Sequence, residues 1–370
     1  MNRKVLTSIK IIEFLISAAL AVLVVYFAYS NFYLKIDSVL IAILLIIGGF
    51  VSALITETMH ELGHLIFGKF CKFSFNKINI SFIKIYKKDG KTKITFKKLQ
   101  QSVAGSTEMI PQTACNLKNR FLYTISGGLI FSFLTFLAFL LCFIFSSKIN
   151  FFVYIFTAAG LPYAFHLFIY NFLPLHLEGA HTDGALVWGI ILKDDSYITA
   201  LNILAIEGLM HEGRSPSEID ENLYFSLPQL QEDDLNFILL TSYRLMYYLD
   251  SGDIENAIRT CDRLEELAEY VPDFYYNDIL SEIMFCECCL KGDDELCKEL
   301  FKGLEFYLKR EDTISSHRIL AAYELYINQD KKISLNHINE ARKKAKESSI
   351  LGLVKYECKL VDCIYEDLSK

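Results

Sequence analysis

No apolar run long enough to cross a membrane occurs after Ser196, although the 370-residue chain is 52% hydrophobic. An ordinary soluble domain of this length is less apolar, so the apolar residues must be concentrated elsewhere. They form four long runs before residue 176. Because a helix needs about 20 apolar residues to cross a bilayer, the absence after Ser196 excludes a membrane-spanning C-terminal half and predicts a soluble one.

The sequence also lacks a regular disulfide framework, and it lacks two Cys-x-x-Cys pairs of the kind that hold structural zinc. Its ten cysteines are irregularly spaced, and most of them lie in segments that we place in the cytoplasm, where thiols stay reduced. Four cysteines crowd into residues 286–297, but cysteine is a common small apolar residue on buried helix faces. We therefore predict free thiols.

The four apolar runs predict the membrane-spanning part of a mainly α-helical protein. The predicted spans are 11–33, 38–67, 121–145 and 151–175. Basic residues precede the first span and follow the second, whereas the other connections carry little charge. The positive-inside rule then places both termini in the cytoplasm. We predict a multi-pass helical bundle over residues 1–194, embedded in the cell membrane and in contact with the lipid bilayer.

The basic connection between the second and third spans, residues 69–118, alternates apolar and polar residues. It has a turn signal at Lys88, Asp89 and Gly90, so we predict a small cytoplasmic β-hairpin, followed by a loop over 104–111 that lines the cleft. Such a hairpin could anchor on anionic lipid headgroups. It could also offer an edge strand to an extended substrate.

Residues 195–370 have the pattern of amphipathic helices joined by short turns. Similar turns recur at Gly252-Asp253, Gly292-Asp293 and Gln329-Asp330, about forty residues apart. The pattern resembles a tetratricopeptide-like solenoid and predicts a cytoplasmic helical-repeat domain over 195–370. Solenoids present concave surfaces that bind a protein or peptide ligand. The alternative is a packed helical appendage that stabilises the membrane domain.

The second span ends in the sequence H-E-x-x-H, formed by His60, Glu61 and His64. Two histidines four residues apart on a helix lie on one face and can share one Zn²⁺ ion, while the intervening glutamate can take a proton from metal-bound water. Ionisable groups at the end of a span are costly to insert and are usually functional. A polar helix end that only reaches toward the membrane surface is the alternative.

An Asn-x-x-Pro motif at Asn171 and an Asp-Gly pair at Asp183 follow two spans later. This order of motifs resembles the site-2 protease family of intramembrane zinc metalloproteases. The resemblance covers about residues 38–190. It implies that Asp183 is the third zinc ligand beside His60 and His64, and that Asn171 positions substrate or stabilises an oxyanion.

Two features depart from the family pattern. Asp183 lies twelve residues beyond Asn171, which is farther than usual, and Glu178 sits nearer the usual spacing. Asp183 keeps the family's residue type and is preferred, with Glu178 as the alternative ligand and His176 and His181 as minor ones. The third span has Ser-Gly-Gly at 126–128 in place of the family's Gly-Pro, although small residues still allow close helix packing.

Together these patterns predict a zinc metalloendopeptidase in which Glu61 activates metal-bound water and Asn171 assists. Its substrate would be a membrane-associated peptide or a single-span protein, and no nucleic-acid partner is expected. The alternative is a membrane-anchored helical-repeat scaffold or sensor with a vestigial metal site.

Overall fold

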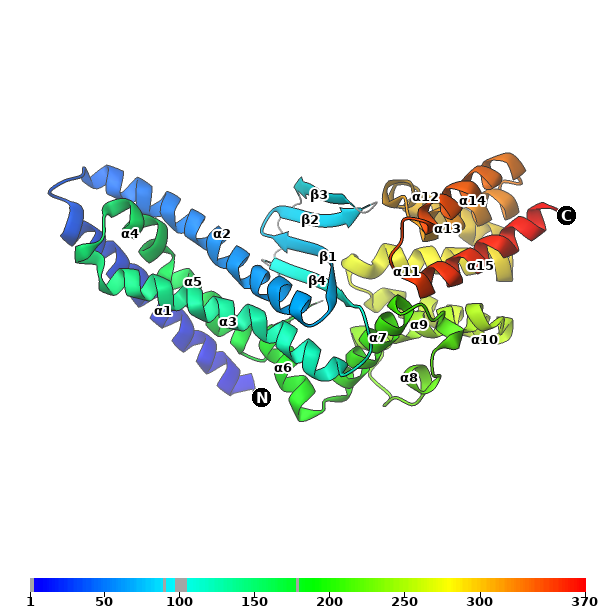
Figure 1. The fold of residues 1–370 in the computed structure, drawn as a ribbon, viewed down its shortest axis with the longest axis horizontal. Helices are drawn as coiled ribbons and strands as arrows, with labels where there is room; N and C mark the ends of the chain where they lie inside the picture. The colour runs from blue at the N-terminus through cyan, green and yellow to red at the C-terminus, as the bar shows by residue number, and fades with distance from the viewer. Residues whose placement is uncertain (1–2, 89–90, 97–104, 178–179) are drawn as a thin grey trace. The chain divides into compact units, whose positions relative to one another are not determined.

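The computed structural model describes residues 3–88, 91–96, 105–177 and 180–370. The fold is mainly helical, with a small antiparallel sheet, as the sequence predicts (Figure 1). The chain divides into two compact units. The first comprises residues 1–87, 92–109 and 118–192, and the second comprises 88–91, 110–117 and 193–370. No disulfide joins the ten cysteines.

The first unit is a helical bundle with a sheet against one end. Its helices are α1 (Arg3–Phe32), α2 (Ser38–Phe70), α3 (Leu117–Ile144), α4 (Phe151–Thr157), α5 (Leu161–Phe172) and α6 (Asp183–Leu192). Within the described residues, four segments are long and apolar enough to cross a membrane: Thr7–Phe32, Ser38–Phe70, Leu117–Ile144 and Phe151–Phe172. This confirms the predicted number of candidate spans.

The fourth span is interrupted, which the sequence prediction of one continuous helix missed. A short 3₁₀ turn, η2 (Ala158–Gly160), separates α4 from α5. Pro162 stands in the first turn of α5, where its missing N–H costs least. Gly160 packs so closely on α2 that an added Cβ would lie 2.3 Å from the Cβ of Ser52. The break therefore lets α4 and α5 both follow the surface of α2.

The basic connection forms four strands instead of one hairpin. They are β1 (Phe73–Ile80), β2 (Ile83–Lys88), β3 (Lys91–Phe96) and β4 (Gly105–Pro111), in the order β3-β2-β1-β4. The alternating pattern conceals a two-residue turn, because Ile80 pairs with Ile83 and Ser81 has a φ of 50°. The segment predicted as a loop at 104–111 contains edge strand β4 instead. The predicted turn residues Asp89 and Gly90 lie outside the described residues.

The second unit is built from helices, several of which form antiparallel pairs. Its main helices are α7 (Asp195–His211), α9 (Leu235–Ser251), α10 (Ile254–Leu267), α11 (Asp273–Cys286), α12 (Asp294–Glu311), α13 (Ile314–Tyr326), α14 (Lys331–Ala345) and α15 (Leu351–Leu368). Its short elements are α8 (Asn222–Phe225), the 3₁₀ turns η3 (Pro216–Glu218) and η4 (Ala268–Tyr270), and the π-helical turn η5 (Glu287–Lys291).

The three predicted turns of this unit have the same construction. Gly252, Gly292 and Gln329 each adopt a left-handed conformation. The aspartate that follows each of them caps the next helix by accepting backbone N–H bonds. A left-handed residue ends one helix and an aspartate starts the next, so the repeated turn chemistry explains the pairs α9–α10, η5–α12 and α13–α14.

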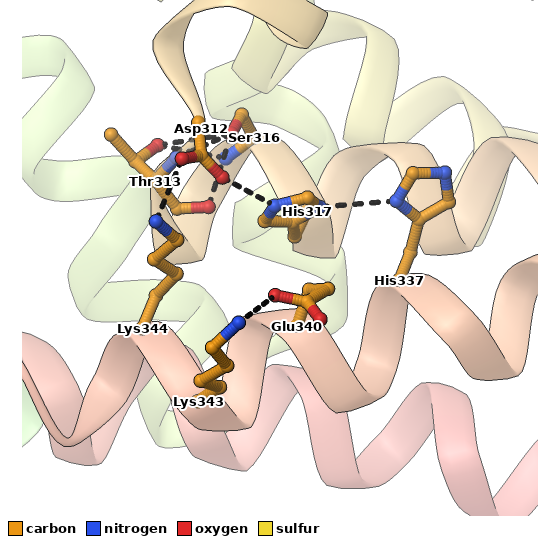
Figure 2. Close-up of polar contacts among 8 residues, drawn as sticks. All are labelled: Asp312, Thr313, Ser316, His317, His337, Glu340, Lys343 and Lys344. Atoms are coloured by element: carbon orange, nitrogen blue, oxygen red, sulfur yellow. Dashed lines mark hydrogen bonds and ion pairs between the residues drawn. The ribbon is translucent and has the colours of Figure 1, made fainter.

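A chain of polar contacts links α13 and α14 in this unit. His317 lies between Asp312 and His337, with its Nε2 atom 3.0 Å from Asp312 Oδ1 and its Nδ1 atom 3.0 Å from His337 Nδ1 (Figure 2). The ammonium of Lys344 also contacts Asp312, at 2.7 Å. Asp312 therefore holds a histidine from one helix and a lysine from the next.

Candidate metal centre

The helix α2 carries both histidines of the H-E-x-x-H sequence on one face. Its start is fixed by Asp37, whose side chain caps the first turn. His60 and His64 are one turn apart, and their Nε2 atoms lie 3.2 Å from each other. Both imidazoles are largely buried. The predicted pair is therefore preformed, with two ring nitrogens converging on one point.

Asp183 reaches the same point from the start of α6. Its Oδ2 atom lies 3.3 Å from Nε2 of both His60 and His64. The hydroxyl of Thr182 donates to the carbonyl of Leu173 at 2.5 Å, which ties this segment to the end of α5. The chain comes so close there that a Cβ on Gly184 would lie 2.1 Å from the carbonyl oxygen of Phe172.

The three donor atoms fit a small tetrahedral cation. Ligand bonds of about 2.0–2.2 Å at tetrahedral angles place donor atoms roughly 3.3–3.6 Å apart. The observed separations are 3.2, 3.3 and 3.3 Å. Asp183 Oδ2 is buried and has no hydrogen-bond partner, although a buried carboxylate oxygen normally has one. A divalent cation bound at this point would give the Asp183 carboxylate oxygen a partner and balance its negative charge.

The outer nitrogens of the two rings are held by α3. His60 Nδ1 lies 2.7 Å from the hydroxyl of Ser132, and His64 Nδ1 lies 3.1 Å from the carbonyl oxygen of Thr124. A carbonyl oxygen can only accept, so His64 donates through Nδ1 and leaves the Nε2 lone pair directed at the site. Such outer contacts fix ring orientation and raise ligand basicity in metal sites.

Close packing of α2 on α3 depends on glycine. A Cβ on Gly63 would lie 2.3 Å from the carbonyl oxygen of Gly127, and a Cβ on Gly128 would lie 2.3 Å from His64 Nε2. The Ser-Gly-Gly sequence at 126–128 therefore provides the small-residue contact, and Gly128 forms part of the wall of the site.

Glu61 lies beside the three donors and under strand β4. Its side chain is buried, and one carboxylate oxygen accepts a 2.5 Å hydrogen bond from the hydroxyl of Thr107. A Cβ on Gly105 would lie 2.3 Å from the other carboxylate oxygen. Sequence patterns did not single out Thr107, because its contact with Glu61 joins positions 46 residues apart.

Of the remaining predicted site residues, Asn171 and His181 lie within the part of the chain that the structure describes. The side-chain amide of Asn171 donates to the carbonyl of Leu167, 3.1 Å away and one turn back on α5. The described hydrogen bonds do not join Asn171 to the three donors. Glu178 lies outside the described residues, and so does the side chain of His176. His181 is exposed.

None of the family models, curated proteins or solved structures with which the chain was compared matches it.

Proposed function

We propose that this protein is an intramembrane zinc metalloendopeptidase. The carrying observation is the convergence of His60 Nε2, His64 Nε2 and Asp183 Oδ2, whose mutual distances of 3.2–3.3 Å suit Zn²⁺. Three protein ligands leave a fourth position open, which is typical of catalytic zinc. When bound, zinc polarises a carbonyl group and lowers the pKa of water to about 7.

Glu61 is the proposed general base. It takes a proton from the attacking water, whose oxygen bonds to the carbonyl carbon of the substrate. The C–N bond then breaks, and Glu61 returns the proton to the leaving nitrogen. Thr107 orients the carboxylate through its hydrogen bond. Burial keeps other water away from this carboxylate.

Asn171 is the proposed oxyanion or substrate-positioning group. Its amide donates to Leu167 within its own helix, so assistance requires this side chain to turn toward the substrate. Apo enzymes often hold catalytic hydrogen bonds in a different arrangement from the substrate complex. The role is therefore tested by substrate-dependent kinetics and not by the geometry of the free protein.

Strand β4 is the proposed contact for the substrate backbone. It is at the edge of the sheet, and it carries Thr107 directly over Glu61. Side chains of β1 hold it in place: Asn79 donates to Ser106 at 2.8 Å, and Lys77 pairs with Glu108 at 2.5 Å. An edge strand can add an extended peptide through main-chain hydrogen bonds. The substrate would be a membrane-associated peptide or a single-span protein.

The membrane orientation and the role of the second unit complete the proposal. Basic residues near the first and second spans place both termini in the cytoplasm. The paired helices of residues 195–370 form a tetratricopeptide-like repeat domain that binds a protein or peptide ligand. Repeated left-handed turns followed by aspartate caps support this assignment.

The test is to purify the full chain in detergent and to measure bound zinc together with cleavage of a panel of single-span peptides. Glu61→Gln should retain zinc and lose cleavage, whereas Asp183→Ala should lose both. Glu178→Ala tests the alternative ligand. The matched control is Asp195→Asn, which changes an exposed carboxylate and should alter neither quantity.

Absence of zinc from the wild-type protein, or undiminished cleavage by Glu61→Gln, would overturn the protease assignment. Loss of zinc in Glu178→Ala but not in Asp183→Ala would assign the third ligand to Glu178. Stoichiometric zinc without cleavage of any peptide in the panel would favour the alternative function, a membrane-anchored helical-repeat scaffold or sensor with a vestigial metal site.

A further inference from the structure

The edge strand β3 exposes two large apolar side chains near its end. Phe96 is 80% exposed and Ile94 is 66% exposed. Because they are two residues apart on a strand, they lie on the same face of the sheet. The ring of Phe96 stacks on that of Phe82, with centroids 6.1 Å apart. Phe82, Ile94 and Phe96 form the apolar tip of the sheet. An exposed apolar edge strand is an aggregation site unless something covers it.

The contacts of β4 with α2 show how the sheet is oriented along this helix. The hydroxyl of Thr107 donates to Glu61. Two residues further along the strand, the sulfur of Met109 lies where a Cβ on Gly68 would be placed. Strand β4 therefore follows α2 from the level of the candidate metal centre toward the C-terminal end of the helix.

Strand β1 runs in the opposite direction. Asn79 donates to Ser106, and Asn76 donates to Glu108, so β1 is antiparallel to β4. Its end, and the turn into β2 that carries the first residue of the apolar tip, therefore point back along α2. The arrows of β1 and β3 in Figure 1 have this same direction. The apolar tip thus lies about level with the candidate metal centre.

That level corresponds to the boundary of the bilayer. The 33 residues of α2 are about 50 Å long, whereas a hydrocarbon core is about 30 Å thick. Counted from Ser38, a distance of about 30 Å ends near Thr58, about one turn before Glu61. All three residues of the apolar tip belong to the same compact unit as the candidate spans. The tip therefore reaches the surface at which hydrocarbon meets headgroups.

Two lysines lie a short way along the strands from this tip. Lys84 is two residues from Phe82, and Lys93 is three residues from Phe96, which corresponds to about 7 and 10 Å along a strand. The headgroup layer is about 5–8 Å thick on each side of the core. The Lys84 ammonium lies 5.0 Å from the ring centroid of Tyr86, on the side away from the tip. Lysines at this height are attracted to anionic lipids.

We propose that the apolar tip inserts into the interface of an anionic bilayer, with Lys84 and Lys93 among the lipid headgroups. This contact would fix the depth of the sheet, and with it the position of Thr107 on the opposite edge strand. The lipid surface is the occupant that the observations favour, because the tip continues the lipid-facing surface of the spans and the lysines complement anionic headgroups. The proposal does not depend on the protease assignment.

The test places a fluorescent reporter at the tip. The chain contains one tryptophan, Trp188, so Phe96→Trp in a Trp188→Phe background gives a single signal. The full chain is reconstituted into nanodiscs of phosphatidylcholine and phosphatidylglycerol, which leave both membrane faces accessible to solutes. Acyl chains brominated near the headgroup should quench the fluorescence of Phe96→Trp. Acrylamide in the water should quench it only weakly.

Two matched variants in the same background calibrate the signal. Phe14→Trp alters a 69% exposed residue of the first candidate span and should be quenched by the brominated lipid. Phe306→Trp alters a 75% exposed residue of α12 and should be quenched by acrylamide only. Adding Lys84→Gln/Lys93→Gln to the Phe96→Trp chain should weaken its quenching by brominated lipid. Circular dichroism checks the fold of each variant.

Three results would overturn the proposal. The first is quenching of Phe96→Trp by acrylamide and not by brominated lipid, as expected for Phe306→Trp. The second is protection from both quenchers, which would mean that protein covers the tip, either a second copy or another part of the chain. The third is absence of lipid quenching in Phe14→Trp, which would remove the membrane assignment itself. Equal lipid quenching with and without the two lysines would overturn the headgroup contact.

Discussion

Thr107 and Glu61 are joined by a 2.5 Å hydrogen bond from the hydroxyl of the edge strand β4 to the buried carboxylate at the end of α2. This contact makes the sheet part of the candidate site. The described contacts of Thr107 are to Glu61 and not to the three proposed ligands. Thr107 can therefore orient the proposed base without taking part in metal binding.

Replacing Thr107 by valine should impair cleavage without removing zinc. A hydrogen bond to a charged group contributes about 1.5–3 kcal/mol, which corresponds to a loss of about 10- to 100-fold in kcat/KM. Thr107→Ser keeps the hydroxyl and should restore most of the activity. Cleavage assays with parallel zinc analysis measure both quantities. Equal losses in the valine and serine variants would contradict an orienting role for the hydroxyl.

Replacing Gly128 by alanine should displace His64. The new Cβ would lie 2.3 Å from His64 Nε2. The imidazole must move, because the Cβ itself is held by the backbone of the helix α3. We expect zinc affinity to fall at least about tenfold, measured by competition with a chelator. Gly49→Ala is the control, because its added Cβ would lie 3.9 Å from the nearest atom. Unchanged zinc affinity in Gly128→Ala would mean that His64 is not a ligand.

Local patterns predicted the parts of this fold that depend on neighbouring residues. The candidate spans follow from apolar runs, and the placement of His60 and His64 on one face follows from a spacing of four residues. The turns at Gly252 and Gly292 were recognised by residue type, because a left-handed position favours glycine and an aspartate caps the next helix.

Long-range contacts were not predictable in the same way. The alternating pattern conceals the turn at Ser81 and predicts one strand where the structure has two, β1 and β2. Spacing alone could not choose between Asp183 and Glu178, whereas the structure brings the Asp183 carboxylate 3.3 Å from both imidazoles. The contact of Ser132 with His60 links positions 72 residues apart, and no local motif indicates it.

Replacing Ser132 by alanine should weaken the metal site without removing a ligand. The variant loses the 2.7 Å contact that orients His60. Removal of such an outer partner typically costs 10- to 100-fold in metal affinity, so we expect about that loss here. Thr135→Ala is the matched control, since Thr135 is on the same helix but donates to the carbonyl of Phe131. Equal zinc affinities in the two variants would argue against orientation by Ser132.

Protonation of His337 should lower the stability of the helical unit in mild acid. Burial, His317 of α13 and Lys309 of α12 lower the pKa of His337 from its usual value of 6.5, against an opposing effect of Glu340 on its own helix. The unfolded chain then binds a proton more readily than the folded chain. The stabilising contribution is therefore present above about pH 6.5 and is lost as the pH falls toward the lower folded pKa.

The contact between His337 and His317 makes this effect local (Figure 2). Amide hydrogen exchange in α14 should accelerate as the pH is lowered from about 7.5 to 5.5, after correction for the intrinsic dependence of exchange on pH. His337→Gln should reduce this acceleration, because glutamine does not titrate. His211→Gln, a change in α7 outside this contact, should retain the wild-type dependence. An identical pH dependence in His337→Gln and the wild type would show that another group destabilises α14 in acid.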